Sequence, residues 1–242
     1  MDSSPGNPAA SAISLEKVAA TAPTLVSLYK SAGVSLDKRG IRGERAAVYL
    51  VLDRSGSMRR FYRDGTVQHL AEQVLGLAAH FDDDGVVPVV FFSTEVDTRE
   101  ITLGRHEGRI NEIHDALGHM GRTYYEKAMH AVIDHYRDSG ANAPAFVVFQ
   151  TDGAPDNRSA TTRLLTDASR LPLFWQFVGF GDDSFAYLRR LDALTGRTVD
   201  NAGFFAAGKE PRAIPDGELY DQLMTEFPDW LRAARRAGIV TI

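Results

Sequence analysis

Two acidic residues and three hydroxyl residues stand in this chain where they could together bind a metal ion. Asp53 is followed at alternate positions by Ser55 and Ser57, within the string DRSGS. Asp152 lies in a second short string, TDG, and Thr123 lies between the two strings in GRT. Alternate residues of an extended turn point to the same side, so the carboxylate of Asp53 and both serine hydroxyls are expected to converge.

The donor atoms of this set are hard oxygens, and they favour a hard divalent cation. Two carboxylates roughly cancel the charge of such a cation, and neutral hydroxyls complete its shell without further neutralisation. The cation then stays a good Lewis acid and keeps room for water or for a carboxylate from another molecule. We therefore expect Mg²⁺, with Mn²⁺ or Ca²⁺ as alternatives that use the same ligand chemistry.

Buried strands and crossover helices are predicted to bring these residues together. From residue 46 onward, apolar runs alternate with helical periods, as in parallel sheets with crossover helices. Strands are predicted at 46–52, 86–92, 96–103, 145–150, 173–180 and near 199–206, the third of them at an edge. Helices are predicted at 68–81, 109–117, 125–136, 161–169, 185–194 and 218–236, the last broken or restarted by Pro228 because proline cannot continue a helix. The fold class is thus α/β, a doubly wound, Rossmann-like, mostly parallel six-stranded sheet flanked by helices.

Ligands of such sheets bind where strands end at their carboxyl edge, near the point at which the crossover direction reverses. Asp53 follows the first predicted strand and Asp152 follows the fourth. Both carboxylates are therefore expected at that edge.

The N-terminal part of the chain differs from the rest in composition. Residues 1–13 are rich in Ser, Ala, Pro and Gly and are predicted to form a disordered tail. Residues 14–44 are predicted to form a helical extension, with Pro23 in a first turn and Gly33 as a stop. Residues 45–238 are predicted to form the main domain, and the apolar stripe of the extension is expected to pack against it.

Composition excludes several classes of function. The chain has 242 residues, a formal net charge of -5 and no cysteine. Disulfides and thiolate chemistry are therefore excluded, and nucleic acid is not an expected partner because its binding depends on clustered Lys and Arg. The sequence shows neither a cleavable signal pattern nor a long apolar span, so a cytoplasmic protein without membrane contact is expected. The oligomeric state is left open.

The set Asp53-x-Ser55-x-Ser57, Thr123 and Asp152 resembles the metal-ion-dependent adhesion site of von Willebrand factor type A domains. The string GRTYYEKA, which includes Thr123, is similar to that family's threonine-bearing loop, although Arg122 stands where members often have a second glycine. The resemblance implies protein–protein recognition through the metal, with an acidic residue of the partner completing the coordination.

The segments that flank the domain narrow the resemblance further. Residues 25–36 ahead of it and the string FPDWL behind it look like bacterial type A domains associated with tellurium-resistance and stress-response gene clusters. This finer match implies an intracellular adaptor in such a system.

Two other functions compete with a metal-dependent adaptor. In a magnesium-dependent phosphoryl-transfer enzyme, Asp53 would be the nucleophile. Against this, Ser55 stands where such phosphatases commonly have a second acid, and no phosphate-cradling Gly-Lys-Ser loop is present. We therefore expect no enzyme. The second alternative is a scaffold whose site holds no metal.

Several local patterns have simpler explanations. Asp-x-Ser-x-Ser alone is typical of a turn that bonds its own backbone. Asp156 and Asn157 are interpreted as the cap of the next helix, rather than as ligands. Residues 53–57 form the expected metal loop. Just after it, a basic run either frames an acidic partner or is solvated surface, and it consists of Arg59, Arg60 and Arg63. The histidines are expected at the surface or at satisfied core positions.

Overall fold

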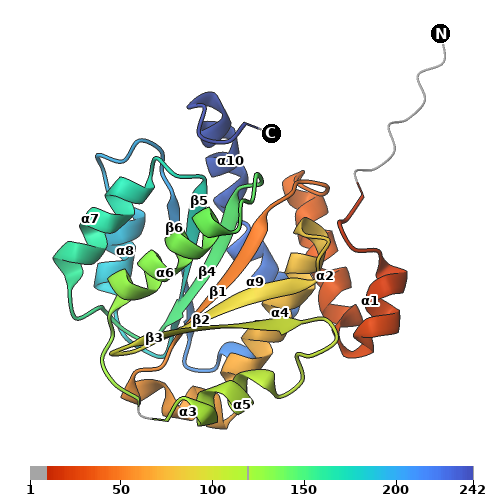
Figure 1. Cartoon of the computed structure of the whole chain (residues 1–242), viewed down its shortest axis with the longest axis horizontal. Helices are drawn as coiled ribbons and strands as arrows, with labels where there is room; N and C mark the ends of the chain where they lie inside the picture. The colour runs from red at the N-terminus through yellow and green to blue at the C-terminus, as the bar shows by residue number, and fades with distance from the viewer. Residues whose placement is uncertain (1–9, 119, 242) are drawn as a thin grey trace.

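A six-stranded sheet forms the centre of the computed structural model, which describes residues 10–118 and 120–241 (Figure 1). Its strand order is β3-β2-β1-β4-β5-β6. The strands are β1 (Ala47–Asp53), β2 (Val86–Phe92), β3 (Val96–Thr102), β4 (Ala145–Thr151), β5 (Leu173–Phe180) and β6 (Ala202–Gly208). β3 pairs antiparallel with β2 at one edge, and the other neighbouring strands are parallel. The prediction of a doubly wound, mostly parallel α/β sheet is confirmed.

Helices cover both faces of this sheet (Figure 1). One face carries α6 (Tyr125–Asp138), α7 (Arg158–Ala168) and α8 (Ala186–Asp192). The other carries α2 (Val26–Arg39), α4 (Thr66–Phe81), α9 (Asp216–Leu223) and α10 (Phe227–Arg236). Alternate strand residues face opposite layers, so Tyr49 and Val51 belong to one apolar cluster and Leu50 and Leu52 to the other. The central strand is buried on both faces, which explains its unbroken apolar run.

The strand order places Asp53 and Asp152 at the switch point of the sheet, where the direction of the crossovers reverses. The chain passes from β1 to β2 on one side and later returns to β4 on the other side of β1. Asp53 is the last residue of β1, and Asp152 directly follows β4, whose register pairs Leu52 with Gln150. The two carboxylates therefore leave adjacent parallel strands at the same edge, as predicted.

The N-terminal helix α1 (Leu15–Thr21) packs against α2, and α2 packs against α4. Their approach is close at Gly76, where an added Cβ would lie 3.1 Å from the Cβ of Leu28. The prediction of a stop at Gly33 is wrong, because α2 continues to Arg39 and ends at Gly40 in the left-handed conformation. Gly33 lies against the His80 ring instead, and a Cβ there would be 3.1 Å from it. This glycine is explained by packing rather than by helix termination.

The predicted disordered tail is too long at its C-terminal end. Ile13 is buried, its amide donates to the carbonyl of Ala79 at 2.8 Å, and its carbonyl accepts from the Tyr29 hydroxyl at 2.7 Å. Residues 1–9 lie outside the described residues. The division into an extension at 14–44 and a domain at 45–238 stays a prediction.

Two short helices at the carboxyl edge and one proline near the C-terminus complete the fold. α3 (Arg59–Arg63) follows the metal loop and was not predicted, while α5 (Arg109–Ala116) lies beside it. The predicted helix at 218–236 is divided into α9 and α10. Pro228 lies in the first turn of α10, where its missing amide hydrogen disrupts no helical bond.

Candidate metal centre

Asp53 is fully buried at the end of β1, and protein donors hold both of its carboxylate oxygens. Its Oδ1 accepts from the Ser55 amide at 2.6 Å, and its Oδ2 accepts from the Thr151 hydroxyl at 2.7 Å. Burial, with the nearby Asp152 carboxylate as a second cause, raises the pKa of Asp53 to about 7. The carboxyl group is thus fixed in position, but its negative charge is not compensated.

The two serines of the loop lie between the two carboxylates. The hydroxyls of Ser55 and Ser57 are 3.1 Å apart. Burial raises the pKa of Asp152, while hydrogen bonds from Ser57 and Ser55 oppose that rise. Four of the predicted site residues, Asp53, Ser55, Ser57 and Asp152, are therefore gathered into one group of oxygen atoms.

This group fits a hard cation. None of the ion pairs among the described residues includes Asp53 or Asp152. A buried and a partly buried carboxylate that repel each other without a basic partner are unfavourable, and a divalent ion between them would remove that repulsion. Within the described part of the chain, no cluster of three or more His, Asp or Glu side chains could hold a metal. The shell must therefore use hydroxyls and outside ligands.

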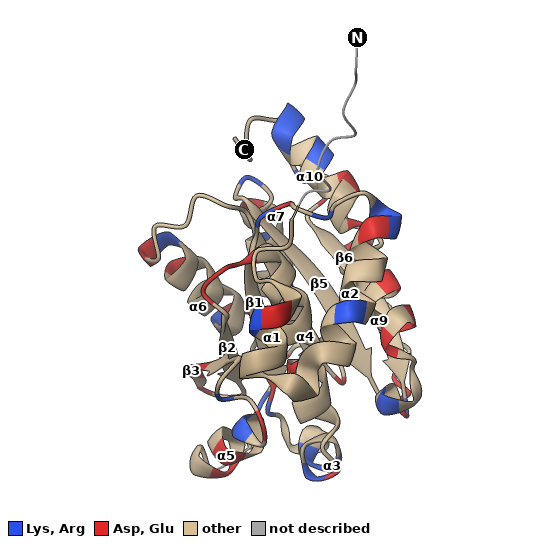
Figure 2. Ribbon diagram, turned by 90° about the vertical axis from the view of Figure 1, so that its right-hand side faces the viewer, with Lys and Arg blue, Asp and Glu red and all other residues tan. Residues whose placement is uncertain are grey.

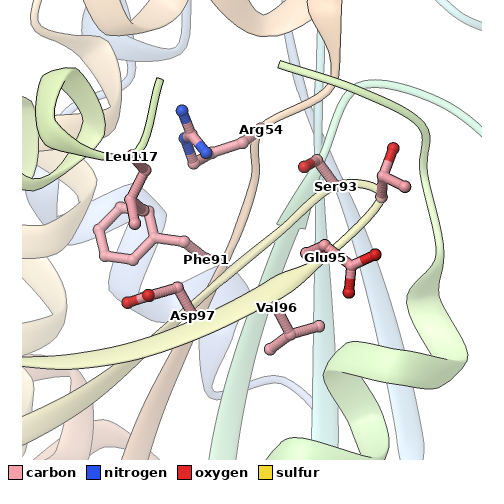
Figure 3. Close-up of a pocket in the computed structure, with 8 residues that line it drawn as sticks. Arg54, Phe91, Ser93, Glu95, Val96, Asp97 and Leu117 are labelled. Atoms are coloured by element: carbon pink, nitrogen blue, oxygen red, sulfur yellow. The ribbon is translucent and has the colours of Figure 1, made fainter. Parts of the chain in front are cut away.

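Arg54, the one basic residue inside the loop, points away from the carboxylates. Its Nε donates to Nδ1 of His114 at 3.1 Å, and its Nη2 donates to the carbonyl of Gly118 at 3.0 Å. Figure 3 shows its guanidinium directed toward the segment at Leu117, at the rim of a cavity of about 430 Å³ whose floor includes Phe91. Arg54 therefore does not replace a metal as the counter-ion.

Thr123 lies on the neighbouring loop before α6, and Asp156 holds it there. The Thr123 amide donates to Asp156 Oδ2 at 2.7 Å, and the Asp156 amide donates to the Thr123 carbonyl at 2.9 Å. No hydrogen bond among the described residues joins the Thr123 hydroxyl to the other four site residues. The structure therefore gathers four of the five predicted residues and leaves Thr123 as a neighbour. The predicted cap is confirmed for Asn157, which accepts from the α7 amide of Ala160, and is wrong for Asp156.

The path of the Thr123 loop depends on a close approach to Thr94. A Cβ at Gly121 would lie 2.2 Å from Thr94 Oγ1, so only glycine fits there without displacement. The same hydroxyl accepts from the amide of Arg122 at 3.1 Å. The arginine that replaces a second glycine is thus accommodated with its side chain exposed.

Three supporting residues of the site were missed at the level of sequence. Thr151 donates to Asp53, and the Tyr125 hydroxyl in turn donates to Thr151 Oγ1 at 2.9 Å. The Tyr62 hydroxyl donates to the Asp53 carbonyl at 3.0 Å. Thr151 directly precedes Asp152 and could have been noticed as a polar residue ending an apolar strand. The tyrosines carry no such signal, because aromatic residues in helices usually indicate only core packing.

The buried histidines have partners within the protein. The ring nitrogens of His80 lie 2.6 Å from the Ser11 hydroxyl and 2.8 Å from the Tyr29 carbonyl. Nδ1 of His106 lies 3.0 Å from the Leu103 carbonyl. These residues therefore stabilise the packing of the core, as satisfied histidines do.

No helix among the described residues has the length and apolar character needed to cross a membrane.

Comparisons of sequence place the chain among known proteins. Residues 45–240 match the model of the vWA-TerF-like family, described as the vWA found in the TerF C terminus. An uncharacterized protein of Bacillus subtilis (strain 168), YcbR, is 38% identical over 216 residues, which cover 87% of this chain and 88% of that protein.

Solved structures resemble the fold at low identity. Proximal thread matrix protein 1 from the mussel byssus is similar with a TM-score of 0.51 at 17% identity, over 79% of this chain and 47% of that one. The pilus adhesin SpaC from Lactobacillus rhamnosus GG, in its open conformation, is similar with a TM-score of 0.50 at 14% identity, over 78% of this chain and 30% of that one. The chain spans about half the length of the mussel protein, and at these identities the likeness concerns the fold alone.

Proposed function

This chain belongs to the vWA-TerF-like family, and from that membership and the geometry of its carboxyl edge we propose that it binds protein partners through a divalent metal ion. The observation that carries the proposal is the pair formed by the buried Asp53 and the partly buried Asp152, whose carboxylates have no ion pair among the described residues and are bridged by serine hydroxyls. Mg²⁺ suits this hydroxyl-rich shell, with Mn²⁺ and Ca²⁺ as alternatives.

In this proposal the protein residues hold the ion and leave room for an outside ligand. Asp53, Ser55, Ser57 and Asp152 hold it directly or through water, and Thr123 approaches from the neighbouring loop. The bound ion supplies a Lewis-acidic position for the carboxylate of a partner's acidic residue. The cytoplasmic location and the tellurium-resistance or stress-response setting follow from the family resemblance and belong to the proposal.

The phosphoryl-transfer alternative has little support from the position of Asp53. A nucleophilic carboxylate needs one free oxygen that the substrate can reach. Both oxygens of Asp53 accept hydrogen bonds within the protein, and the residue has no exposed surface. These contacts suit a ligand or an organiser of the loop better than an attacking group.

A thermal melt of chelator-stripped protein tests the metal site. Adding Mg²⁺, Mn²⁺ or Ca²⁺ at 100 times its dissociation constant should stabilise the native state by about 2.7 kcal/mol, because the ion binds only the folded protein. Asp53→Ala and Asp152→Ala should each abolish this rise. An unchanged melting temperature of the wild type at millimolar metal would contradict the proposal and favour a scaffold without a metal.

A further inference from the structure

A second polar cavity lies next to the metal centre, between α3 and α5. Its volume is about 330 Å³, and the lining residues are Arg59, Tyr62, Arg63, Asn111, His114 and Asp115. Arg59 follows the loop serine Ser57 by two positions, and the Tyr62 hydroxyl bonds the backbone of Asp53. The wall of the cavity and the metal loop are therefore one continuous structure.

Two arginines of this cavity have no side-chain partner among the described residues. α3 carries three arginines in a single short helix, and Figure 2 shows basic residues there, at the same end of the molecule as α5. Arg60 pairs with Glu210 at 3.0 Å. No ion pair or hydrogen bond of the described residues includes the side chains of Arg59 or Arg63, and both residues are exposed. In a chain with a net charge of -5, these are uncompensated positive charges beside the metal.

His114 adds a neutral hydrogen-bond donor to the cavity. Because Arg54 Nε can only donate, Nδ1 of His114 must be the acceptor of their 3.1 Å bond. In the neutral ring the proton is then on Nε2. Burial and the adjacent Arg54 lower the pKa of His114, so the ring is neutral near pH 7. Stacking on Tyr62, with ring centres 3.8 Å apart, fixes the orientation of the ring.

Asn111 contributes a polar side chain to the wall of the cavity. Its Oδ1 is buried and accepts no hydrogen bond from the described residues, so a ligand in the cavity does not reach this atom.

We propose that this cavity is a second subsite for the partner protein. One acidic residue of the partner completes the coordination of the metal ion, and a second acidic side chain of the same partner binds in the cavity. The inference rests on the proposed function and adds the partner's chemistry: an extended protein segment with two carboxylates, one on the metal and one between Arg59 and Arg63. Two arginines and Asp115 give the lining a net charge of about +1, which a single carboxylate neutralises.

Panning of a random dodecapeptide phage library on the immobilised full chain in Mg²⁺, with elution at low pH, tests this subsite. Wild-type protein should enrich peptides with two acidic residues at a fixed separation. The variant Arg59→Gln/Arg63→Gln should enrich peptides in which only one acidic position is selected. Arg163→Gln/Arg170→Gln is the matched control, because these two exposed arginines also lack ion pairs among the described residues and belong to the α7 region.

Synthetic forms of one enriched peptide measure how much the second acidic residue contributes to affinity. Replacing its second acidic residue with serine should weaken binding to wild type and to the control about three- to tenfold, as expected for one carboxylate on two exposed arginines. The same replacement should leave binding to Arg59→Gln/Arg63→Gln unchanged. The magnesium-induced rise in melting temperature should be equal in all three proteins, which shows that the metal site is intact.

The outcomes separate the two proposals. An equal loss in wild type and in Arg59→Gln/Arg63→Gln, or enrichment of a single acidic position by wild type, would overturn the second subsite and leave the metal-dependent function standing. Peptides that bind equally well with magnesium and with chelator would overturn the proposed function instead. Tighter binding of a synthetic peptide with a phosphorylated residue in place of the second acidic residue would overturn the choice of a carboxylate.

Discussion

The molecule holds two carboxyl groups of similarly raised pKa at opposite ends of its sheet. Asp53 lies at the carboxyl edge, and Glu226 lies just before α10, which Figure 1 places at the other end. Burial is the largest cause in both cases, and neighbouring carboxylates add to it, so that each pKa is about 7. None of the ion pairs of the described residues involves either group.

The surroundings of the two groups differ in the kind of positive charge that they can accept. Around Asp53, two protein donors fix the carboxylate, and the hydroxyls of Ser55 and Ser57 offer further oxygens to a cation. Around Glu226, the nearby polar group is Gln176 Oε1, a buried acceptor without a partner. A Cβ at Gly203 would lie 2.8 Å from Gln176 Oε1 and 3.1 Å from Glu226 Oε1, so glycine leaves space for both.

A proton, rather than a metal, satisfies the second group. Protonated Glu226 can donate to Gln176 Oε1, whereas a metal would find few ligands there. A raised pKa therefore identifies a carboxylate that lacks a positive partner, and the donors and acceptors around it decide whether that partner is a metal ion or a proton.

The largest expected effect is the pH dependence at Asp53 and its removal by metal. The folded pKa of about 7 exceeds the ordinary value of 3.8, so stability from this group is present at low pH and is lost as pH rises from about 4 to about 7. The loss is about 4 kcal/mol without metal. Saturating Mg²⁺ should abolish most of it, because a bound cation favours the ionised form. Urea unfolding of wild type between pH 4 and 8, with Mg²⁺ and with EDTA, measures both curves.

Asp53→Asn is the control for that measurement. The difference between wild type and variant isolates this group from all others that titrate. In EDTA the difference should change with pH, and in the variant Mg²⁺ should have no effect. A pH dependence of the wild type that is equal with and without Mg²⁺ would show that the carboxyl edge, like the opposite end, accepts only a proton.

A second, smaller effect concerns the loop that carries Thr123. Asp156→Ala removes the acceptor of the Thr123 amide and should weaken metal binding about tenfold, as is typical when a group that orients a ligand is lost. Asp156→Asn keeps an acceptor oxygen and should retain affinity close to that of wild type. Titration of Mg²⁺ against the melting temperature gives the apparent dissociation constants. Equal affinity in Asp156→Ala and wild type would show that the loop takes no part in the metal centre.

The two ends of the sheet also differ in how much of their structure could be predicted from the sequence. Residues 86–92 and 173–180 were predicted with the bounds found in β2 and β5, because a strand buried on both faces is an unbroken apolar run. The grouping of Asp53, Ser55, Ser57 and Asp152 followed from residue type and from the edge at which parallel strands end. These features depend on local pattern and on topology, and both can be read from the chain.

Features that depend on pairs of residues distant in sequence could not be predicted. Asp156 reaches Thr123 across two loops, and Gly33 lies in a helix for a packing reason that involves His80. Glu226, just before α10, and Gln176 in β5 both lie next to Gly203 of β6, although the three residues are far apart in sequence. In each case the single residue has a common local explanation, such as a cap, a stop or a surface charge. Only the folded arrangement distinguishes the alternatives.

The smallest expected effect is at Glu226, and it tests whether this carboxyl group binds a proton rather than a metal ion. Its folded pKa of about 7 lies above the ordinary value of 4.5, so stability from this group is present at low pH and is lost as pH rises from about 4.5 to about 7. Glu226→Gln removes the charge, and its amide can donate to Gln176 Oε1. The variant should therefore be more stable than wild type at pH 8, by about 1 kcal/mol once partial exposure and screening are allowed for.

The advantage of Glu226→Gln should disappear at pH 4.5, where wild-type Glu226 carries its own proton, and it should be the same in Mg²⁺ and in EDTA. Urea unfolding at the two pH values, with and without Mg²⁺, measures it. Exposed Glu100→Gln in the edge strand β3 changes the net charge equally and should leave stability unchanged. A gain at pH 8 that vanished in Mg²⁺ would mean that this end also binds the metal, and the contrast between cation and proton would fail. A gain in stability independent of metal at Glu226, together with a metal-dependent effect at Asp53, would establish that contrast. The raised pKa would then be explained by a metal site at Asp53 and by a bound proton at Glu226.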